Sequence, residues 1–156
     1  MAFEYKLVKQ ALKAFIQTTM GIPGGQIYTA PPKQTDITVY PAFIIRSATA
    51  VQRMVGEDGP TKVEYTLLLG IYTRAATSLA ASDELDDHLK AFDTAVAATN
   101  IAGLPATGLT DSRWSDMGRL DQSTDFMDAY ADTPGTVVYE ARVAVVITEQ
   151  TPYMVG

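Results

Sequence analysis

Two long stretches of the chain are rich in β-type residues, and they face each other across a short glycine-rich segment. The first runs from Phe43 to Val55 and the second from Lys62 to Thr73, with Gly56-Glu57-Asp58-Gly59-Pro60 between them. The second alternates between apolar and polar positions, which is typical of a strand with one buried face. The apolar positions of that face are Val63, Tyr65, Leu67, Leu69 and Ile71. The pattern predicts a long β-hairpin with this face in the core and the opposite face partly covered.

Two other stretches carry apolar residues at helical spacing. The first predicts a helix over residues 3–20, which Gly21 is placed to end. The second predicts a helix over residues 82–99, with Ser82 as its N-cap and acidic residues just after it, where the helix dipole favours negative charge. The apolar stripe of this second helix consists of Leu85, Leu89, Phe92 and Val96.

The remaining signals are for strands. Glycines and prolines flank Gln26-Ile27-Tyr28 and leave room for at most one short strand. Residues 113–120 are consistent with a strand that has a bulge or bend at Gly118. Residues 136–148 alternate clearly and are expected to complete the sheet. The expected fold is a single α+β domain of residues 1–156, with a mostly antiparallel sheet, a long β-hairpin and two helices packed on one face.

The composition excludes several kinds of chemistry. The chain of 156 residues has no cysteine, which removes disulfides, thiolate metal sites and cysteine nucleophiles. Its apolar runs are far shorter than the roughly 20 residues of a membrane-spanning helix. The first residues lack the pattern of a secretory signal. We therefore expect a soluble product of the cytoplasm with no membrane partner.

The single histidine offers the strongest candidate for a metal site. His88 follows Glu84 by four residues, so the two side chains can lie on one helix face and bind a metal together. No third ligand stands at a recognisable spacing, and a solvated helix face is the simpler interpretation. The segment Gly21-Ile22-Pro23-Gly24-Gly25 follows a helix and lacks the lysine of a phosphate loop. No catalytic residue, metal site or cofactor is predicted.

Charge is distributed unevenly along the chain, whose net charge is −6. Residues 1–56 hold six basic and two acidic residues, or +4, whereas residues 57–156 hold six basic and sixteen acidic residues, or −10. A basic half and an acidic half in each chain are suited to head-to-tail contacts between identical subunits. The alternative is that folding intermixes the charges. The candidate interface residues are Arg46, Arg53, Glu57, Asp58 and Glu64.

The segment from residue 111 to 132 is strongly acidic. It carries six aspartates against Arg113 and Arg119, and the aspartate spacing does not match a calcium-binding EF-hand. We expect a long acidic loop or hairpin that is either solvated or faces a partner or a channel. It also holds apolar and aromatic residues that serve either as contact anchors or as tethers onto the core. These residues are Trp114, Met117, Phe126, Met127 and Tyr130.

The order of these elements resembles a known family. An N-terminal amphipathic helix, a strand start at Tyr40-Pro41-Ala42-Phe43-Ile44-Ile45 and a hairpin ending in residues 65–73 are followed by an acid-capped helix and a C-terminal strand. This layout resembles the tail terminator, or tail completion and neck, proteins of long-tailed bacteriophages. The resemblance is one of layout and length over nearly the whole chain, with no signature motif.

The resemblance implies a structural virion protein, assembled in the host cytoplasm and without enzymatic activity. Such a protein forms a ring, typically a hexamer, that caps the tail tube, stops its polymerisation and meets the head connector or neck protein. A negative lumen would let DNA pass without specific binding, because like charges gain nothing from counterion release. The candidate residues for a lumen-facing or tube-facing loop are Asp111, Asp116, Asp121, Asp125, Asp128 and Trp114.

Three alternatives stay open. The first is a head-closure or connector neck protein, which would share the ring and bind the portal side. The second is a small metal- or ligand-binding enzyme that uses His88. The third is a dimeric binding module of the cytoplasm. If the basic half meets the acidic half of a neighbour, reversing the charges of Arg46 and Arg53 should weaken ring formation in sedimentation experiments.

Overall fold

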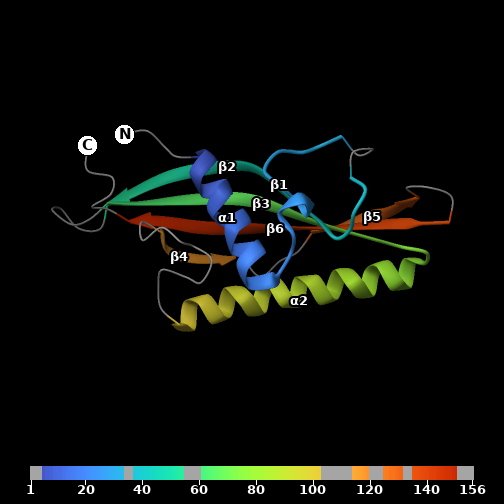
Figure 1. Cartoon of the computed structure of the whole chain (residues 1–156). Coiled ribbons are helices and arrows are strands. Elements are labelled where there is room, and N and C mark those ends of the chain that lie inside the picture. The colour runs from blue at the N-terminus through green and yellow to red at the C-terminus, as the bar shows by residue number, and fades with distance from the viewer. Residues whose placement is uncertain are drawn as a thin grey trace.

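The computed structural model describes residues 5–33, 37–54, 61–102, 114–119, 125–131 and 135–150. Within these residues lie two α-helices, a 3₁₀ helix and six strands. In chain order they are α1 (Tyr5–Met20), η1 (Gly24–Gln26), β1 (Ile27–Tyr28), β2 (Ala42–Met54), β3 (Thr61–Ala75), α2 (Ser78–Ala102), β4 (Trp114–Arg119), β5 (Asp125–Ala131) and β6 (Val137–Gln150). Figure 1 shows the long strands side by side with both helices packed against them. The fold is α+β, as the sequence predicted.

Three long antiparallel strands form the centre of the sheet, whose order is β1-β2-β3-β6-β4. The predicted hairpin is confirmed: β2 pairs with β3 from Ala42 opposite Tyr72 to Met54 opposite Thr61. β3 then pairs with β6 along its whole length. The short β1 adds to the outer edge of β2 in parallel, so the sheet is mostly, but not entirely, antiparallel. The predicted turn between β2 and β3 lies outside the described residues.

The described parts of the acidic segment form two strands, and each pairs with β6. β4 pairs with residues 145–149 of β6, and β5 pairs with residues 137–142 of the same strand. The two strands thus follow one another along β6, on the side away from β3. The reason is that β6 is 14 residues long and its free edge offers backbone groups that need partners. The strand predicted over residues 113–120 is confirmed, but its register shift lies between Trp114 and Asp116 and not at Gly118.

Both predicted helices are present. α1 ends at Met20, and Gly21 follows with φ of +69°, the left-handed conformation that favours glycine after a helix. α2 begins at Ser78, four residues earlier than predicted, so Ser82 is not its N-cap. Instead, the Thr77 hydroxyl oxygen accepts a hydrogen bond from the Ala80 backbone N–H at 3.2 Å. Threonine caps helices too, and the alanines after Leu79 extend the helix toward it. Neither helix has the long apolar stretch that crossing a bilayer requires.

The main core lies between the helices and one face of the sheet. All five predicted core residues of β3 and the four-residue stripe of α2 are buried there. The rings of Phe15 in α1 and Phe92 in α2 meet edge to face, with centroids 6.4 Å apart. Met117 of β4 is fully buried in the same core. Among the residues of the acidic segment, Met117 therefore tethers its strand to the core.

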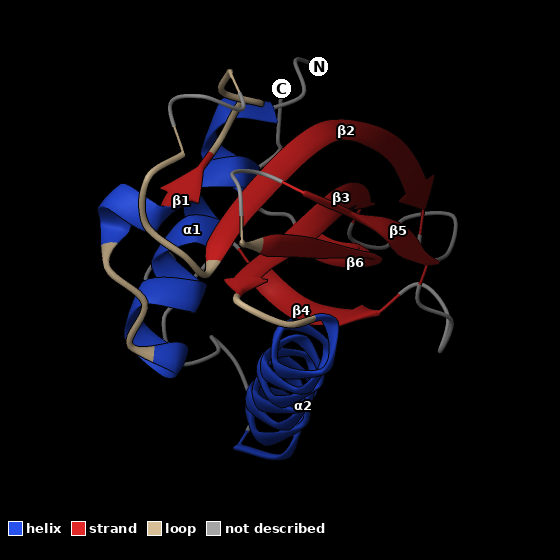
Figure 2. Cartoon of the chain, turned by 90° about the vertical axis from the view of Figure 1, so that its right-hand side faces the viewer, coloured by secondary structure: helices blue, strands red, loops and turns tan. Residues whose placement is uncertain are grey.

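A smaller apolar cluster lies on the opposite face of the sheet, at the end where β2 begins and β3 ends. Figure 2 shows both helices on one side of the curved sheet. The buried members of this cluster are Ile37, Ala42, Ile44, Tyr72 and Val138, and Tyr28 and Tyr40 pack against them. This partial cover on the second face agrees with the predicted hairpin pattern, and it surrounds a group of charged side chains.

Candidate functional site

Four polar side chains meet on the second face of the sheet. They are Arg46 of β2, Tyr72 of β3, and Glu140 and Arg142 of β6. Strand register brings them together: Tyr72 stands directly opposite Glu140, and Arg142 stands opposite Gly70. Since side chains two residues apart in a strand share a face, Glu140 and Arg142 lie side by side. We call these four residues the Arg–Tyr–Glu cluster.

One carboxylate oxygen is the centre of the Arg–Tyr–Glu cluster. The Tyr72 hydroxyl donates to Glu140 Oε1 at 2.6 Å, and Arg142 Nε donates to the same oxygen at 2.6 Å. Arg46 Nη2 donates to the Tyr72 hydroxyl oxygen and lies 3.7 Å from Glu140 Oε1. The Glu140 side chain is 8% exposed. A buried carboxylate is costly unless it is paired, and here two hydrogen-bond donors and the Arg46 guanidinium surround it.

The protonation states of the cluster follow from these contacts. Burial, together with the hydrogen bond to Glu140 and its negative charge, raises the pKa of Tyr72 above its usual 10.0. The hydrogen bond to Glu140 raises the pKa of Arg142. At neutral pH the tyrosine therefore keeps its proton and donates it, and Arg142 is charged. Among the described side chains of the cluster, two guanidinium groups face one carboxylate.

Gly70 leaves space for this arrangement. A Cβ atom at this position would lie 3.2 Å from Cε2 of Tyr72 and 3.4 Å from Oε1 of Glu140. The first distance is closer than ordinary van der Waals contact. The absence of a side chain at Gly70 therefore lets the Tyr72 ring and the Glu140 carboxylate approach each other across the strands.

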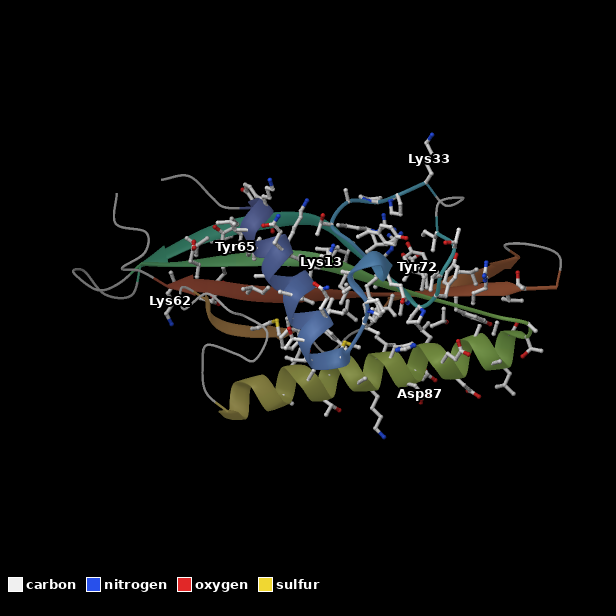
Figure 3. The ribbon with its side chains drawn as sticks, viewed as in Figure 1. Lys13, Lys33, Lys62, Tyr65, Tyr72 and Asp87 are labelled. Carbon is white, nitrogen blue, oxygen red and sulfur yellow. The ribbon has the colours of Figure 1, made fainter. Side chains whose placement is uncertain are left out.

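A cavity of about 280 Å³ opens beside the cluster. Its apolar walls come from Pro31, Pro32, Ile37 and Ile44, and its polar side comes from Arg46, Tyr72 and Glu140. Arg46 Nε is buried and has no hydrogen-bond partner among the residues that the structure describes. Figure 3 shows Tyr72 below the loop that carries Lys33, whose own side chain extends away from the sheet. Apolar walls next to an unsatisfied cationic donor are suited to recognising a ligand.

The predicted interface residues are only partly brought together. Arg46 belongs to the Arg–Tyr–Glu cluster, so its charge is already engaged within the chain. Glu64 is partly exposed on β3, opposite Val51. Arg53 stands opposite Lys62 in the hairpin register. Glu57 and Asp58 lie outside the described residues, and the interface itself stays a prediction.

The predicted lumen residues are spread along the edge of β6. Trp114 stands opposite Glu149, Asp116 opposite Thr148 and Asp125 opposite Arg142. Asp128 lies within β5. Asp111 and Asp121 fall outside the described residues. The described members therefore belong to two strands in line, not to one loop.

His88 is not fully solvated, contrary to the simpler interpretation of its sequence context. Its ring meets the Phe43 ring edge to face at a centroid distance of 6.2 Å, and the residue is half-buried. Burial lowers the pKa of His88 below 6.5, against the raising effect of the charges on Glu84 and Asp87. Within the described parts of the chain, no three potential ligands gather to hold a metal ion. His88 thus packs as part of the helix–sheet contact.

The two helices carry opposite charge. α1 contains three lysines and no acidic residue, whereas α2 contains five acidic residues and one lysine. Asp83, Glu84, Asp86, Asp87 and Asp93 of α2 are all exposed. Figure 3 shows Asp87 on the side of α2 away from the sheet and Lys13 on α1. Among the described residues, part of the basic first half of the chain and part of its acidic second half thus lie on separate helices.

No family model matches the chain, and a search of curated proteins finds no match for it either. A functional assignment therefore depends on the fold, the placement of charge and the resemblance in element order.

Proposed function

We propose that this chain is a structural, non-enzymatic protein of a bacteriophage virion. It forms a ring, typically of six copies, that caps the tail tube, stops tube polymerisation and joins the tail to the head. The element order carries the proposal: a helix, a long hairpin, an acidic helix and a long C-terminal strand resemble the tail terminator layout. The α+β fold is compatible with that layout.

The separated charges on α1 and α2 support the ring. A closed ring with heterologous contacts needs two different, complementary surfaces on each subunit. Both helices pack on the same face of the sheet, where Phe15 of α1 meets Phe92 of α2, but the lysines belong to α1 and the exposed carboxylates to α2. The lysines of one copy can then contact the carboxylates of the next copy, and each copy keeps both surfaces available for its two neighbours. Such contacts also guide association, because opposite potentials attract at a distance.

The acidic strands support the proposed passage of DNA. Asp116, Asp125 and Asp128 lie on β4 and β5, which form one edge of the sheet. If this edge lines the lumen, DNA meets like charge and passes without specific binding. The proposed partners are further copies of the chain, the tail tube protein and the head connector or neck protein. The proposed location is the tail or neck of the virion, after assembly in the host cytoplasm.

The mass of the native particle tests the proposal. We expect analytical ultracentrifugation to give a particle of about six times the 16.8 kDa chain mass, and added tail tubes to bind it and stop growing. A monomer or dimer at every concentration, with tubes that grow unhindered, would contradict the ring. Binding to portal rings in place of tail tubes would favour the head-closure alternative.

Charge reversal on the helices tests the contact within the ring. Reversal at Arg46 is a poor probe because it would also break the Arg–Tyr–Glu cluster. We expect Lys6→Glu with Lys9→Glu to weaken assembly, and adding Asp83→Lys and Asp87→Lys to the same chain to restore it. Lys33→Glu, an exposed lysine outside α1, is the matched control. Unchanged sedimentation of the α1 variant would show that the helices do not form the contact.

A further inference from the structure

The cavity beside the Arg–Tyr–Glu cluster joins two kinds of surface. Pro31, Pro32, Ile37 and Ile44 form its apolar part, and Arg46 with Tyr72 and Glu140 forms its polar part. Binding sites for small molecules commonly combine apolar walls with a few fixed polar groups that orient the ligand. The polar groups here are held in place by the cross-strand contacts of Tyr72 and Glu140. The cavity therefore presents a largely prepared surface, and the Arg46 side chain has to shift for a ligand to reach its buried Nε.

The charge of the cluster indicates what the ligand carries. Two guanidinium groups surround one carboxylate among the described side chains. Arg46 Nε is a buried donor without an acceptor in the described part of the chain. Buried donors are nearly always paired in proteins, so this one is a position that a ligand oxygen can occupy once the Arg46 side chain shifts to expose it. A negatively charged ligand group would both accept this hydrogen bond and balance the second arginine.

The walls and the size of the cavity further restrict the class of ligand that can bind. About 280 Å³ lies just below the range of roughly 300–1,000 Å³ that holds drug-sized ligands. A phosphate would bring more negative charge close to Glu140 and would find prolines and isoleucines where it needs several donors. A carboxylate has a single negative charge, and a short aliphatic group attached to it can contact the apolar walls.

We propose that this cavity binds a carboxylate that carries a short aliphatic group, with Arg46 Nε donating to a carboxylate oxygen. The aliphatic group packs against Ile37 and Ile44. Such a carboxylate is present in free small acids and in the aspartate and glutamate side chains of another copy of this acidic chain. The site does not depend on the proposed role in the virion, because the cluster and the cavity belong to a single chain.

The first experiment compares an acid with its neutral counterpart. Isobutyrate and isobutyramide have nearly the same shape, and only the first carries a negative charge. We expect isobutyrate to shift the methyl NMR signals of Ile37 and Ile44 in a saturable way, and isobutyramide to bind at least about tenfold more weakly, since hydrogen bonds to charged groups are the stronger ones. Equal binding of the two, or no saturable shift with isobutyrate at the lowest protein concentration, would overturn the proposal.

Two matched arginine variants test which donor holds the carboxylate. Arg46→Lys keeps the positive charge but removes the Nε–H group, and we expect it to weaken isobutyrate binding about tenfold. Arg74→Lys is the control, because Arg74 stacks on the Tyr40 ring at 4.7 Å and does not line the cavity. An equal loss of affinity in both variants would overturn the role of Arg46. If Arg46→Lys does not fold, the comparison of acid and amide on the unaltered chain decides the proposal.

Protein concentration separates the two sources of the carboxylate. If a side chain of another copy enters the cavity, the Ile37 and Ile44 methyl signals move toward their isobutyrate-bound positions as protein concentration rises. Isobutyrate then competes, and its apparent Kd increases with protein concentration. If the ligand is a free acid, the signals and the Kd are independent of protein concentration. Both results support a carboxylate site, and they differ only in what fills it.

Discussion

The two faces of the central sheet are stabilised by different kinds of interaction. The face under the helices is held by apolar packing: Val63, Tyr65, Leu67, Leu69 and Ile71 alternate along β3 and are all buried. The opposite face is held at one end by a smaller apolar cluster and by the Arg–Tyr–Glu cluster. Apolar packing requires side chains of about the right volume at regularly spaced positions, whereas the polar cluster requires several groups in fixed positions. The first face is therefore suited to stability and the second to recognition.

The largest expected effect on stability comes from a substitution in the core under the helices. Phe92→Ala removes a fully buried ring that contacts Phe15, and such truncations cost about 3–5 kcal/mol of the free energy of unfolding. Leu79→Ala on the same helix is the matched control, because Leu79 is 72% exposed and should change stability by less than about 0.5 kcal/mol. Urea unfolding of both variants measures the difference. Similar losses in the free energy of unfolding for the two variants would mean that α2 does not pack as described.

A smaller effect is expected from the second face. Glu140→Gln keeps the side-chain shape but leaves Arg46 and Arg142 without their carboxylate. Hydrogen bonds to charged groups contribute about 1.5–3 kcal/mol, and partial exposure of both arginines, 24% and 31%, reduces this to about 1–2 kcal/mol. Glu84→Gln on the exposed side of α2 is the control and should be nearly neutral. If the two changes cost the same, the cluster does not stabilise this face.

Gly70→Ala tests how tightly the second face is packed. The new methyl group would lie 3.2 Å from the Tyr72 ring, whose hydroxyl is fixed by hydrogen bonds, so we expect a loss of about 1 kcal/mol. Gly118→Ala in β4 is the matched control, because a Cβ there meets no atom of the described residues within 4 Å. That change should be neutral or stabilise by a few tenths of a kcal/mol, since alanine restricts the unfolded chain. Thermal unfolding should therefore show a loss of stability for Gly70→Ala alone, and a neutral Gly70→Ala would contradict tight packing.

The sequence predicted the helix face well because apolar periodicity is a local signal. The hairpin, both helices and the stripe of α2 follow from it. The N-cap of α2 was misplaced because Ser82 and Thr77 are both acceptable caps, and only the extent of the helix decides between them. In the acidic segment the strand over residues 113–120 was predicted, but β5 was not, because it contains aspartates at positions 125 and 128 and pairs only with the long edge of β6.

The second face was largely missed for a different reason. Tyr72 and Glu140 are 68 residues apart in the chain, and only the register of β3 on β6 makes them neighbours. Arg46 was noticed for its charge, yet it was assigned to a contact between subunits. The closest local signal was Glu140 and Arg142, two charged residues on one face in the apolar first part of a strand. Charged pairs of this kind inside a predicted central strand indicate a partner on the neighbouring strand.

The two faces should also respond to pH in opposite directions. Burial lowers the pKa of His88 on the helix face, so its contribution to stability is present above pH 6.5 and declines as the pH falls below that value. Burial and Glu140 raise the pKa of Tyr72 on the second face, so its contribution is present below pH 10.0 and declines as the pH rises above it.

Urea unfolding between pH 5 and about pH 11 measures both effects. The stability difference between the unaltered chain and His88→Gln should shrink toward acid pH, and the difference from Tyr72→Phe should shrink toward alkaline pH. Differences that stay constant with pH would show that neither group is buried as described, because burial is the main cause of both shifts.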